Sequence, residues 1–257
     1  MMTTNLLSAN QRRERIAEKS SLVVEWIGDH NVSTTPILAE MLGLQTAATT
    51  RTLKKLEADG VLVADEIPAL GGNIAVWGLS AKGALVYSQG HAQRYTPYQL
   101  RRSKAGSLAH EFEVQRARIG ALRRGWRDWQ SERELIRGGI ASGWPKLPDA
   151  LVQAADGAWV AIEVERTPKT LKRYRYIVGS YLLLLAKRKI QRVQYVTVDP
   201  VKALALQRLF YGIGYVQIDG QRHSLSEQHL RRFVFYDMQE WRTPAMAEGS
   251  ANAQPST

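Results

Sequence analysis

The sequence has 257 residues, of which 44% are hydrophobic and 23% charged, and it contains no cysteine. This composition is typical of a globular protein with one large or two smaller domains, and it excludes disulfides, thiolate metal sites and a cysteine nucleophile. The net charge of +11 lies entirely in residues 101–257, which contain 26 basic and 15 acidic residues, because residues 1–100 contain nine of each. Such an excess favours a polyanionic partner, most often nucleic acid, and a merely basic protein is the alternative.

The longest apolar stretch runs from Tyr176 to Ala186 and is interrupted by Gly179 and Ser180. A membrane-spanning helix needs about 20 apolar residues, so we interpret this stretch as a buried helix. The polar N-terminus does not have the pattern of a signal peptide. We therefore expect a cytoplasmic protein without membrane insertion.

The first ninety residues predict three helices, a hairpin and a further helix. The spacing of apolar residues and the capping residues give helices over 12–29, 36–42, 45–60 and 80–88 and strands over 61–63 and 74–77. In the third helix, Leu53 and Leu56 face inward by this spacing. The side chains expected on its exposed side are Thr49, Thr50, Arg51, Lys54 and Lys55.

This pattern resembles the winged helix-turn-helix DNA-binding families, and the segments LEADGVL and WGLSAKG are typical of them. The resemblance implies a DNA-binding domain over 1–90 whose third helix enters the major groove, with those five side chains contacting phosphates or bases. The predicted wing carries Asp65 and Glu66 and no basic residue, so we expect it to serve packing or dimerisation. A winged helix used only for protein contacts is the alternative.

A linker is predicted over 91–107, a second domain over 108–242 and a disordered tail over 243–257. The second domain alternates helices and strands in the order α-β-β-β-α-β-α-β. Its expected strands are 129–136, 148–152, 158–165, 193–198 and 215–218, and its expected helices are 108–125, 168–187 and 200–212. On the first of these strands, Glu132 and Glu134 would share one face.

Three carboxylates give the sharpest chemical signal in this domain. Asp149 begins one predicted strand, and Glu163 and Glu165 lie two residues apart on the next, so their side chains point to the same face. Like charges in one place repel each other unless they are exposed, protonated or bridged by a cation. Oxygen ligands of this kind suit Mg²⁺ or Mn²⁺, so we expect a divalent ion on these three residues.

This spacing and the order of the elements resemble the PD-(D/E)xK nuclease superfamily. The resemblance implies an α+β or α/β fold with a mixed sheet flanked by helices, and a metal that activates attack on a phosphodiester. The third motif position should be lysine, and here it is Glu165. The resemblance then implies that Lys169 or Lys172 supplies the lysine from the following helix.

The chain resembles the plasmid replication-relaxation family and the related MobC-type mobilization relaxases more closely. The matching elements are His110 and the segments SEREL, PDAL and AIEVERT, over roughly residues 20–200. The resemblance implies site-specific nicking of supercoiled plasmid DNA at a transfer origin, with Asp149, Glu163, Glu165, Glu132 and Lys172 as catalytic residues. It also implies accessory mobilization proteins and a conjugative coupling protein as partners.

Basic residues and tyrosines follow the acidic strand and favour binding of a DNA strand. The residues expected to hold phosphates or stack on bases are Arg166, Lys169, Arg173, Tyr174 and Tyr176. The attacking group would be water or a tyrosine, namely Tyr174, Tyr176 or Tyr181. Two other functions remain open, a non-catalytic replication or transcription regulator on a degenerate nuclease fold and a protein-interaction scaffold in a mobilization complex.

Overall fold

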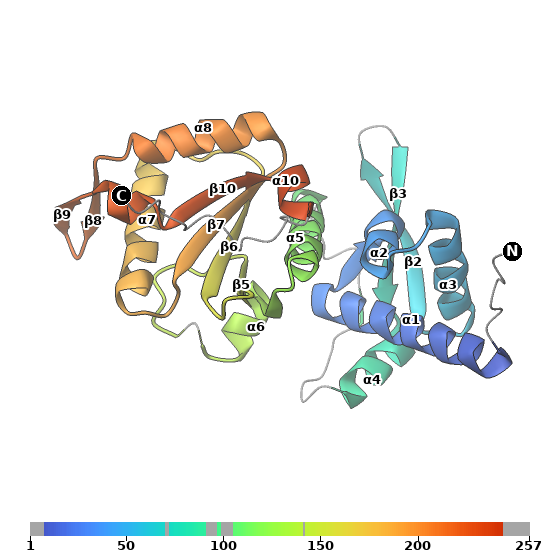
Figure 1. Ribbon diagram of the computed structural model, residues 1–257. Coiled ribbons are helices and arrows are strands. Elements are labelled where there is room, and N and C mark those ends of the chain that lie inside the picture. Colours follow the sequence, from blue (N-terminus) through green and yellow to red (C-terminus); the bar gives the residue numbers. More distant parts are fainter. Residues whose placement is uncertain (1–7, 70–71, 91–96, 99–104, 141, 244–257) are drawn as a thin grey trace, which may run out of the picture. The chain divides into compact units, whose positions relative to one another are not determined.

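The computed structural model describes residues 8–69, 72–90, 97–98, 105–140 and 142–243 (Figure 1). The chain divides into two compact units, Met1–Gln115 and Arg116–Thr257, which we call unit 1 and unit 2. The division falls within helix α5 (Ala105–Arg123), whereas the sequence predicted a boundary in a linker over 91–107. Most of that linker and nearly all of the predicted tail lie outside the described residues, and 105–107 belong to α5.

Unit 1 has a winged helix-turn-helix arrangement, as the sequence predicted. Its elements are α1 (Ala9–His30), β1 (Val32–Thr34), α2 (Thr35–Leu42), α3 (Thr46–Ala58), β2 (Leu62–Ala69), β3 (Gly72–Leu79) and α4 (Ala81–Gln89). The three strands form an antiparallel sheet in the order β1-β3-β2. Leu53 and Leu56 of α3 are buried as expected, and Gly43 ends α2 in the left-handed conformation that favours glycine.

Strands β2 and β3 are longer than the sequence predicted. Asp65 and Glu66 lie within β2, in register with Val76 and Ala75 of β3, so the acidic residues form part of the wing's ladder. The amide of Asn73 donates a hydrogen bond to Glu66 over 2.8 Å. Charged residues have low strand propensity, and this propensity hid the length of β2.

Unit 2 is a mixed sheet with helices, consistent with the predicted α+β class. Its elements after α5 are β4 (Arg127–Ser131), α6 (Glu132–Arg137), β5 (Ala150–Gln153), β6 (Trp159–Glu165), α7 (Leu171–Ala186), β7 (Arg192–Thr197), α8 (Pro200–Tyr211), β8 (Tyr215–Ile218), β9 (Gln221–Ser224), α9 (Glu227–Leu230), β10 (Phe233–Asp237) and α10 (Met238–Arg242). The main sheet has the order β10-β7-β6-β5-β4. Pairs β6–β7 and β7–β10 are parallel, and pairs β4–β5 and β5–β6 are antiparallel.

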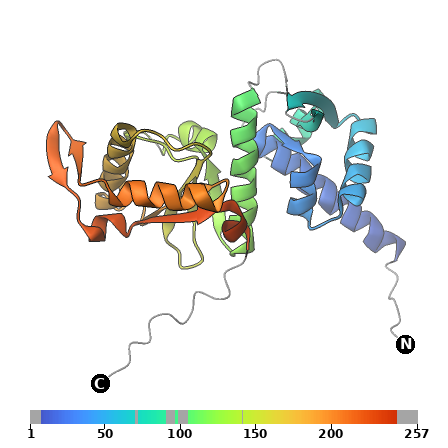
Figure 2. The same cartoon turned by 90° about the horizontal axis from the view of Figure 1, so that it is seen from above.

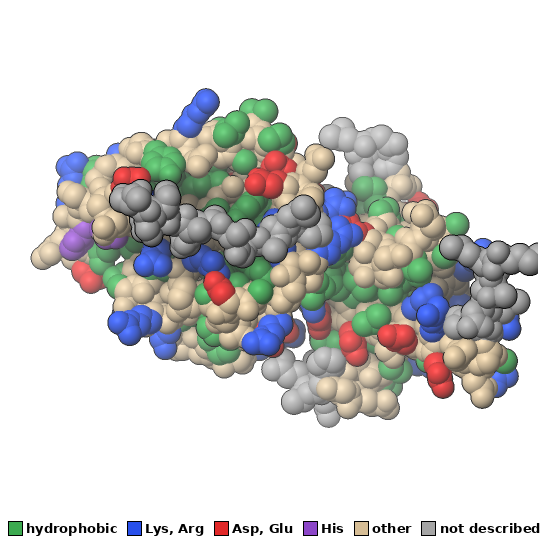
Figure 3. Space-filling model, in the orientation of Figure 1, with side chains coloured by type: hydrophobic (Ala, Val, Ile, Leu, Met, Phe, Trp, Pro, Cys, Tyr) green, Lys and Arg blue, Asp and Glu red, His purple; other side chains and the backbone are tan. Residues whose placement is uncertain are grey.

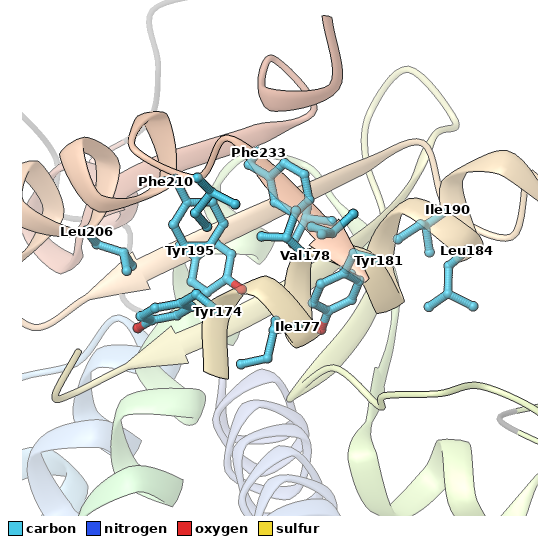
Figure 4. Close-up of a cluster of buried hydrophobic side chains, with 14 of the residues drawn as sticks. Tyr174, Ile177, Val178, Tyr181, Leu184, Ile190, Tyr195, Leu206, Phe210 and Phe233 are labelled. Carbon is cyan, nitrogen blue, oxygen red and sulfur yellow. The ribbon is translucent and has the colours of Figure 1, made fainter. Parts of the chain in front are cut away.

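The core of unit 2 lies between helices α7 and α8 and one face of the sheet. Figure 4 shows the rings of Tyr174 and Tyr181 from α7, Tyr195 from β7 and Phe210 from α8 in a single cluster with Phe233. All five rings are at most 5% exposed. Burial of this much apolar surface fixes α7 against strands β6 and β7.

The predicted strand over 129–136 is wrong in its second half. β4 ends at Ser131, and Ser131 then caps helix α6: its hydroxyl accepts from the N–H of Glu134, while the Glu134 carboxylate accepts from the N–H of Ser131. This capping box outweighs the strand pattern, so Glu132 begins a helix. Helix α7 likewise begins at Leu171, capped by Thr170, and not at 168.

The predicted strand over 215–218 forms, but it does not extend the main sheet. β8 pairs with β9 in a separate two-stranded hairpin, and β10 takes the place beside β7. The hairpin turns at Asp219 and Gly220, which both have positive φ, and it projects from the body of unit 2 in both ribbon views (Figures 1 and 2). Among the described residues, no helix has the length and apolar character needed to cross a membrane.

Candidate functional site

The hairpin of β5 and β6 brings two of the predicted carboxylates together. Ala150 is in register with Ile162 at the end of the β5–β6 ladder, so continuing this register places Asp149, just before β5, opposite Glu163. A carboxylate oxygen of Asp149 also accepts a hydrogen bond of 2.7 Å from the backbone N–H of Val164. Asp149 is half-buried and Glu163 is buried, so the two negative charges lie close together in a poorly solvated place.

A lysine that the sequence analysis did not single out neutralises Glu163. The ammonium of Lys146 and the hydroxyl of Tyr181 both contact Glu163 Oε1. Burial and the charge of Asp149 raise the pKa of Glu163 to about 7, although Lys146 and Tyr181 act in the opposite direction. Burial and the neighbouring charge therefore outweigh the ion pair, and Glu163 titrates near neutral pH.

Glu165 has a separate set of partners. Its carboxylate contacts the ammonium of Lys169 and accepts a 2.9 Å hydrogen bond from the hydroxyl of Tyr174. The backbone N–H of Lys169 donates to the same tyrosine oxygen over 3.1 Å. Lys169 lies before helix α7 and its side chain is 40% exposed, so its ammonium lies at the edge of the buried carboxylate.

Two of the three carboxylates are suitable ligands for a divalent ion. In the part of the chain that is described, no group of three His, Cys, Asp or Glu side chains is placed to hold a metal ion. The expected three-carboxylate cluster is therefore not formed there, and Glu165 is engaged with Lys169. Asp149 and Glu163 remain as a pair, and Mg²⁺ is often held by one or two carboxylates completed by water and substrate phosphates. This donor pair fits such an ion.

The three candidate tyrosine nucleophiles lie in different surroundings. Tyr174 and Tyr181 are fully buried, and burial with the nearby carboxylates raises the pKa of each above its ordinary value. Tyr174 was predicted to stack on bases, and this prediction is wrong because its ring belongs to the core. Tyr176 is 48% exposed, and its hydroxyl donates to the carbonyl of Pro145 over 2.9 Å.

Tyr195 is a further buried phenol at this site that the sequence analysis missed. It is in register with Glu163 on the neighbouring strand, and its hydroxyl has no hydrogen-bond partner within the described ranges. Burial and the charge of Glu163 raise the pKa of Tyr195 well above its ordinary value. Tyr195 therefore stays protonated and can act only as a donor toward the carboxylates.

The remaining predicted residues of unit 2 lie around this edge. Glu132 is exposed, and its backbone N–H donates to the carbonyl of Asp149 over 3.1 Å. The exposed basic side chains are Arg166 after β6 and Lys172 and Arg173 on α7. The guanidinium of Arg173 lies 5.2 Å from the ring centroid of Tyr176. The first turns of α7 thus present cations and one accessible ring to solvent.

Helix α3 exposes three of its five predicted contact residues. Arg51, Lys54 and Lys55 are exposed, and Lys54 pairs with Glu57 over 2.8 Å and lies over the ring of Trp77. Thr49 is completely buried, so its predicted DNA contact is wrong. Thr50 is half-buried, and its hydroxyl donates to the carbonyl of Thr46.

The position of Thr49 follows from helical spacing that was present in the sequence. Thr49 precedes Leu53 by four residues and Leu56 by seven, so the three share the inward face of α3. Lys146 gave no comparable signal, because it lies outside any periodic element. Its approach to Glu163 depends on how residues 142–148 fold over the end of β5.

A comparison with protein families finds one match, which spans both units of the chain. A sequence model of the family described as replication-relaxation matches residues 24–198. No curated protein matches the sequence.

Three solved structures of ZitR from Lactococcus lactis show a weak likeness. A single-substitution variant aligns at 19% identity over 37% of this chain and 59% of that chain, with a TM-score of 0.26. A double variant in apo form aligns at 17% identity over 52% of this chain and 84% of that chain, with a TM-score of 0.27. The structure described as a zinc-responsive MarR family member aligns at 19% identity over 55% of this chain and 76% of that chain, with a TM-score of 0.24. A likeness this weak supports no conclusion about the chain.

Proposed function

The chain belongs to the replication-relaxation family, and from this premise we propose that it is a metal-dependent relaxase that nicks one strand of supercoiled plasmid DNA at a transfer origin. The observation that carries the proposal is the proximity of the Asp149 and Glu163 carboxylates where strands β5 and β6 of a mixed sheet meet. The order of elements around this pair supports it, because apart from the short helix α6 it is a helix, three strands, a crossover helix and a parallel strand, the core expected of a PD-(D/E)xK nuclease.

Asp149 and Glu163 would hold the divalent ion in this proposal. Such an ion, when bound, polarises a phosphodiester and lowers the pKa of a bound water molecule. Lys146 compensates for the motif lysine that is missing at position 165, because its ammonium already lies against Glu163. Its positive charge is suited to stabilise a phosphate at this edge.

The nucleophile in this proposal is water. Tyr174 and Tyr181 are buried with raised pKa values and donate to carboxylates, so neither can reach a phosphodiester as a phenolate. Tyr176 is exposed, but its hydroxyl donates to the carbonyl of Pro145 and no base contacts it within the described ranges.

The two units have different tasks in this proposal. Arg51 and Lys55 of α3 contact duplex phosphates and place the protein on its site. Lys172, Arg173 and Tyr176 on the exposed side of α7 hold the strand to be cut. Accessory mobilization proteins and a coupling protein would receive the nicked plasmid.

One observation favours a second function, a non-catalytic regulator of plasmid replication or transcription. Glu163 and Glu165 each form an ion pair with a lysine, so two of the three carboxylates have a cationic partner without a metal ion. A degenerate nuclease fold that only binds DNA would keep this arrangement. Such a protein would bind DNA with strong salt dependence and without need of a divalent ion.

A nicking assay separates the two functions. Supercoiled plasmid carrying the cognate origin should become open circular with Mg²⁺ or Mn²⁺, and Asp149→Asn should abolish nicking while DNA binding persists. Asp156→Asn is the matched control, because Asp156 lies at the other end of the same hairpin, is exposed and pairs with Arg192. Isothermal titration with Mn²⁺ should show heat with wild type and none with Asp149→Asn. Absence of both nicking and Mn²⁺ binding in wild type would favour the regulator.

A further inference from the structure

The β8–β9 hairpin and helix α7 bring two arginines to the same aromatic ring. The guanidinium carbon of Arg175 on α7 lies 4.3 Å from the ring centroid of Tyr215, and that of Arg222 on β9 lies 3.5 Å from it. These two distances keep the guanidinium carbons within about 8 Å of each other. A strand of the hairpin and a helix of the core thus place two positive charges against the same ring.

Neither arginine is neutralised within the described ranges of the chain. No ion pair is formed by Arg175 or Arg222 there, whereas Lys146, Lys169 and Arg192 each form an ion pair with a carboxylate. The Nε atom of Arg175 is buried and has no hydrogen-bond partner in the same ranges. Two guanidinium groups repel each other, and their attraction to one ring only partly compensates for this.

The surroundings of the pair extend the positive charge. Lys172 precedes Arg175 by one helical turn, is exposed, and also forms no ion pair in the described part of the chain. All four residues of β9 are exposed, and Asp219 in the turn is the hairpin's one acidic residue. Figure 3 shows basic side chains together with His and acidic side chains in the region of this hairpin, at the left of the view.

We propose that Lys172, Arg175 and Arg222 form a phosphate clamp that grips the phosphodiester backbone of a DNA strand. Guanidinium groups bind phosphate through two parallel N–H···O bonds, and the closely spaced phosphates of a DNA strand supply negative charge that offsets the repulsion between the two arginines. A projecting two-stranded ribbon also has the width to lie in or along a DNA groove. The inference rests on the proposed function for the identity of the polyanion, and it adds a contact surface that neither the acidic edge nor α3 supplies.

The test is binding of full-length protein to labelled single-stranded and duplex DNA in EDTA, which prevents any cleavage. Arg175→Gln/Arg222→Gln should weaken binding, and the slope of log affinity against log salt should become shallower by about 1.4 for a single strand or about 1.8 for a duplex. The DNA form that shows its expected change is the one the clamp holds. Arg231→Gln, which removes an exposed arginine already paired with Glu227, should leave the slope unchanged.

Two further measurements protect the interpretation. Arg222→Lys retains the charge but lacks the planar fork, so it should recover the slope and only part of the affinity. Near-ultraviolet circular dichroism should be the same for wild type and the double variant, which shows that the core is intact. A wild-type slope in the folded double variant would overturn the clamp and leave the proposed function standing. Lack of DNA binding by wild type would overturn both, and equal competition by polyglutamate would overturn DNA as the clamp's ligand.

Discussion

The half-buried Lys146 and the buried Glu163 form an ion pair that joins the segment before β5 to strand β6. The ammonium of Lys146 also donates to the carbonyl of Leu147 over 2.7 Å and lies 3.4 Å from the hydroxyl of Tyr181. Because Lys146 precedes Asp149 by three residues, one short segment supplies both the carboxylate of Asp149 and the cation that pairs with Glu163. The pair therefore fixes the geometry of the proposed catalytic edge before any ligand binds.

Replacing Lys146 by methionine should destabilise the protein in a pH-dependent way. At pH 8 the wild-type Glu163 carboxylate is charged, and without Lys146 it must stay buried and unpaired or take up a proton, which costs up to about 3–5 kcal/mol of unfolding free energy. At pH 5 Glu163 is protonated, since its pKa is about 7, so the loss should be smaller. Urea denaturation at the two pH values measures the difference.

Lys189→Met is the matched control for this experiment, because Lys189 is exposed and has no ion pair within the described ranges. It should change stability by less than about 0.5 kcal/mol at either pH. An equal loss at pH 5 and pH 8 for Lys146→Met would contradict the ion pair as the cause.

Glu163→Gln should remove part of the pH dependence of stability. The pKa of Glu163 rises from 4.5 to about 7 on folding, so the folded state binds its proton more tightly. The stability this supplies is fully present below pH 4.5 and is lost as pH rises through 7, a difference of about 3 kcal/mol. Wild type should thus lose more stability than Glu163→Gln between pH 5 and pH 8. Parallel curves from denaturation at several pH values would show that Glu163 does not titrate in this range.

Substitution of Tyr174 should lower the stability of the protein, whereas substitution of Tyr176 should lower its affinity for DNA. Tyr174→Phe removes a hydroxyl that is bonded to Glu165 and Lys169, so unfolding free energy should fall by about 1–3 kcal/mol with no change in DNA affinity. Tyr176→Ala removes an exposed ring and should weaken single-stranded DNA binding, by about 1–3 kcal/mol if one base stacks on it. Thermal unfolding and fluorescence anisotropy, measured on both variants, give the comparison. A loss of DNA affinity in Tyr174→Phe alone would reverse the assignment.

The sequence predicted the winged helix and the order of the main elements of unit 2 because their signals are local. Gly43 and Thr170 mark helix ends, and the apolar spacing of α3 gives its inward face. The error at 129–136 was also local. The Ser131–Glu134 capping box was visible in the sequence, but the alternation of the surrounding residues had the period of a strand.

The carboxylates of the site could be predicted from the sequence, but their hydrogen-bond and ion-pair partners could not. The pairing of Asp149 with Glu163 follows from antiparallel register, which hydrophobic pattern specifies. The partners of the carboxylates do not follow, because Lys146 and Tyr195 approach through tertiary packing between segments without a common period. Tyr174 illustrates the same limit, since its place between two basic residues concealed that it faces the core.

Helix α3 offers the final prediction, which separates its DNA-contacting face from its packing face. Arg51→Ala and Lys55→Ala should each weaken duplex binding and reduce the salt slope by about 0.9, because each removes an exposed cation without an ion pair in the described ranges. Lys54→Ala should have a smaller effect, since its ammonium is already held by Glu57.

Thr49→Ala provides the contrast on the same helix. Thr49 is buried and its hydroxyl donates to the carbonyl of Gln45 over 3.2 Å, so the substitution should lower stability and leave the salt slope unchanged. Fluorescence anisotropy over a range of salt concentrations, with thermal unfolding of each variant, measures both quantities. A changed salt slope in Thr49→Ala and an unchanged slope in Arg51→Ala would mean that the inward face of α3 contacts DNA. That face is buried in the folded unit together with Leu53 and Leu56, so this result would contradict DNA binding by the folded helix. The two variants together therefore test whether unit 1 binds DNA through the exposed side of α3 in its folded form.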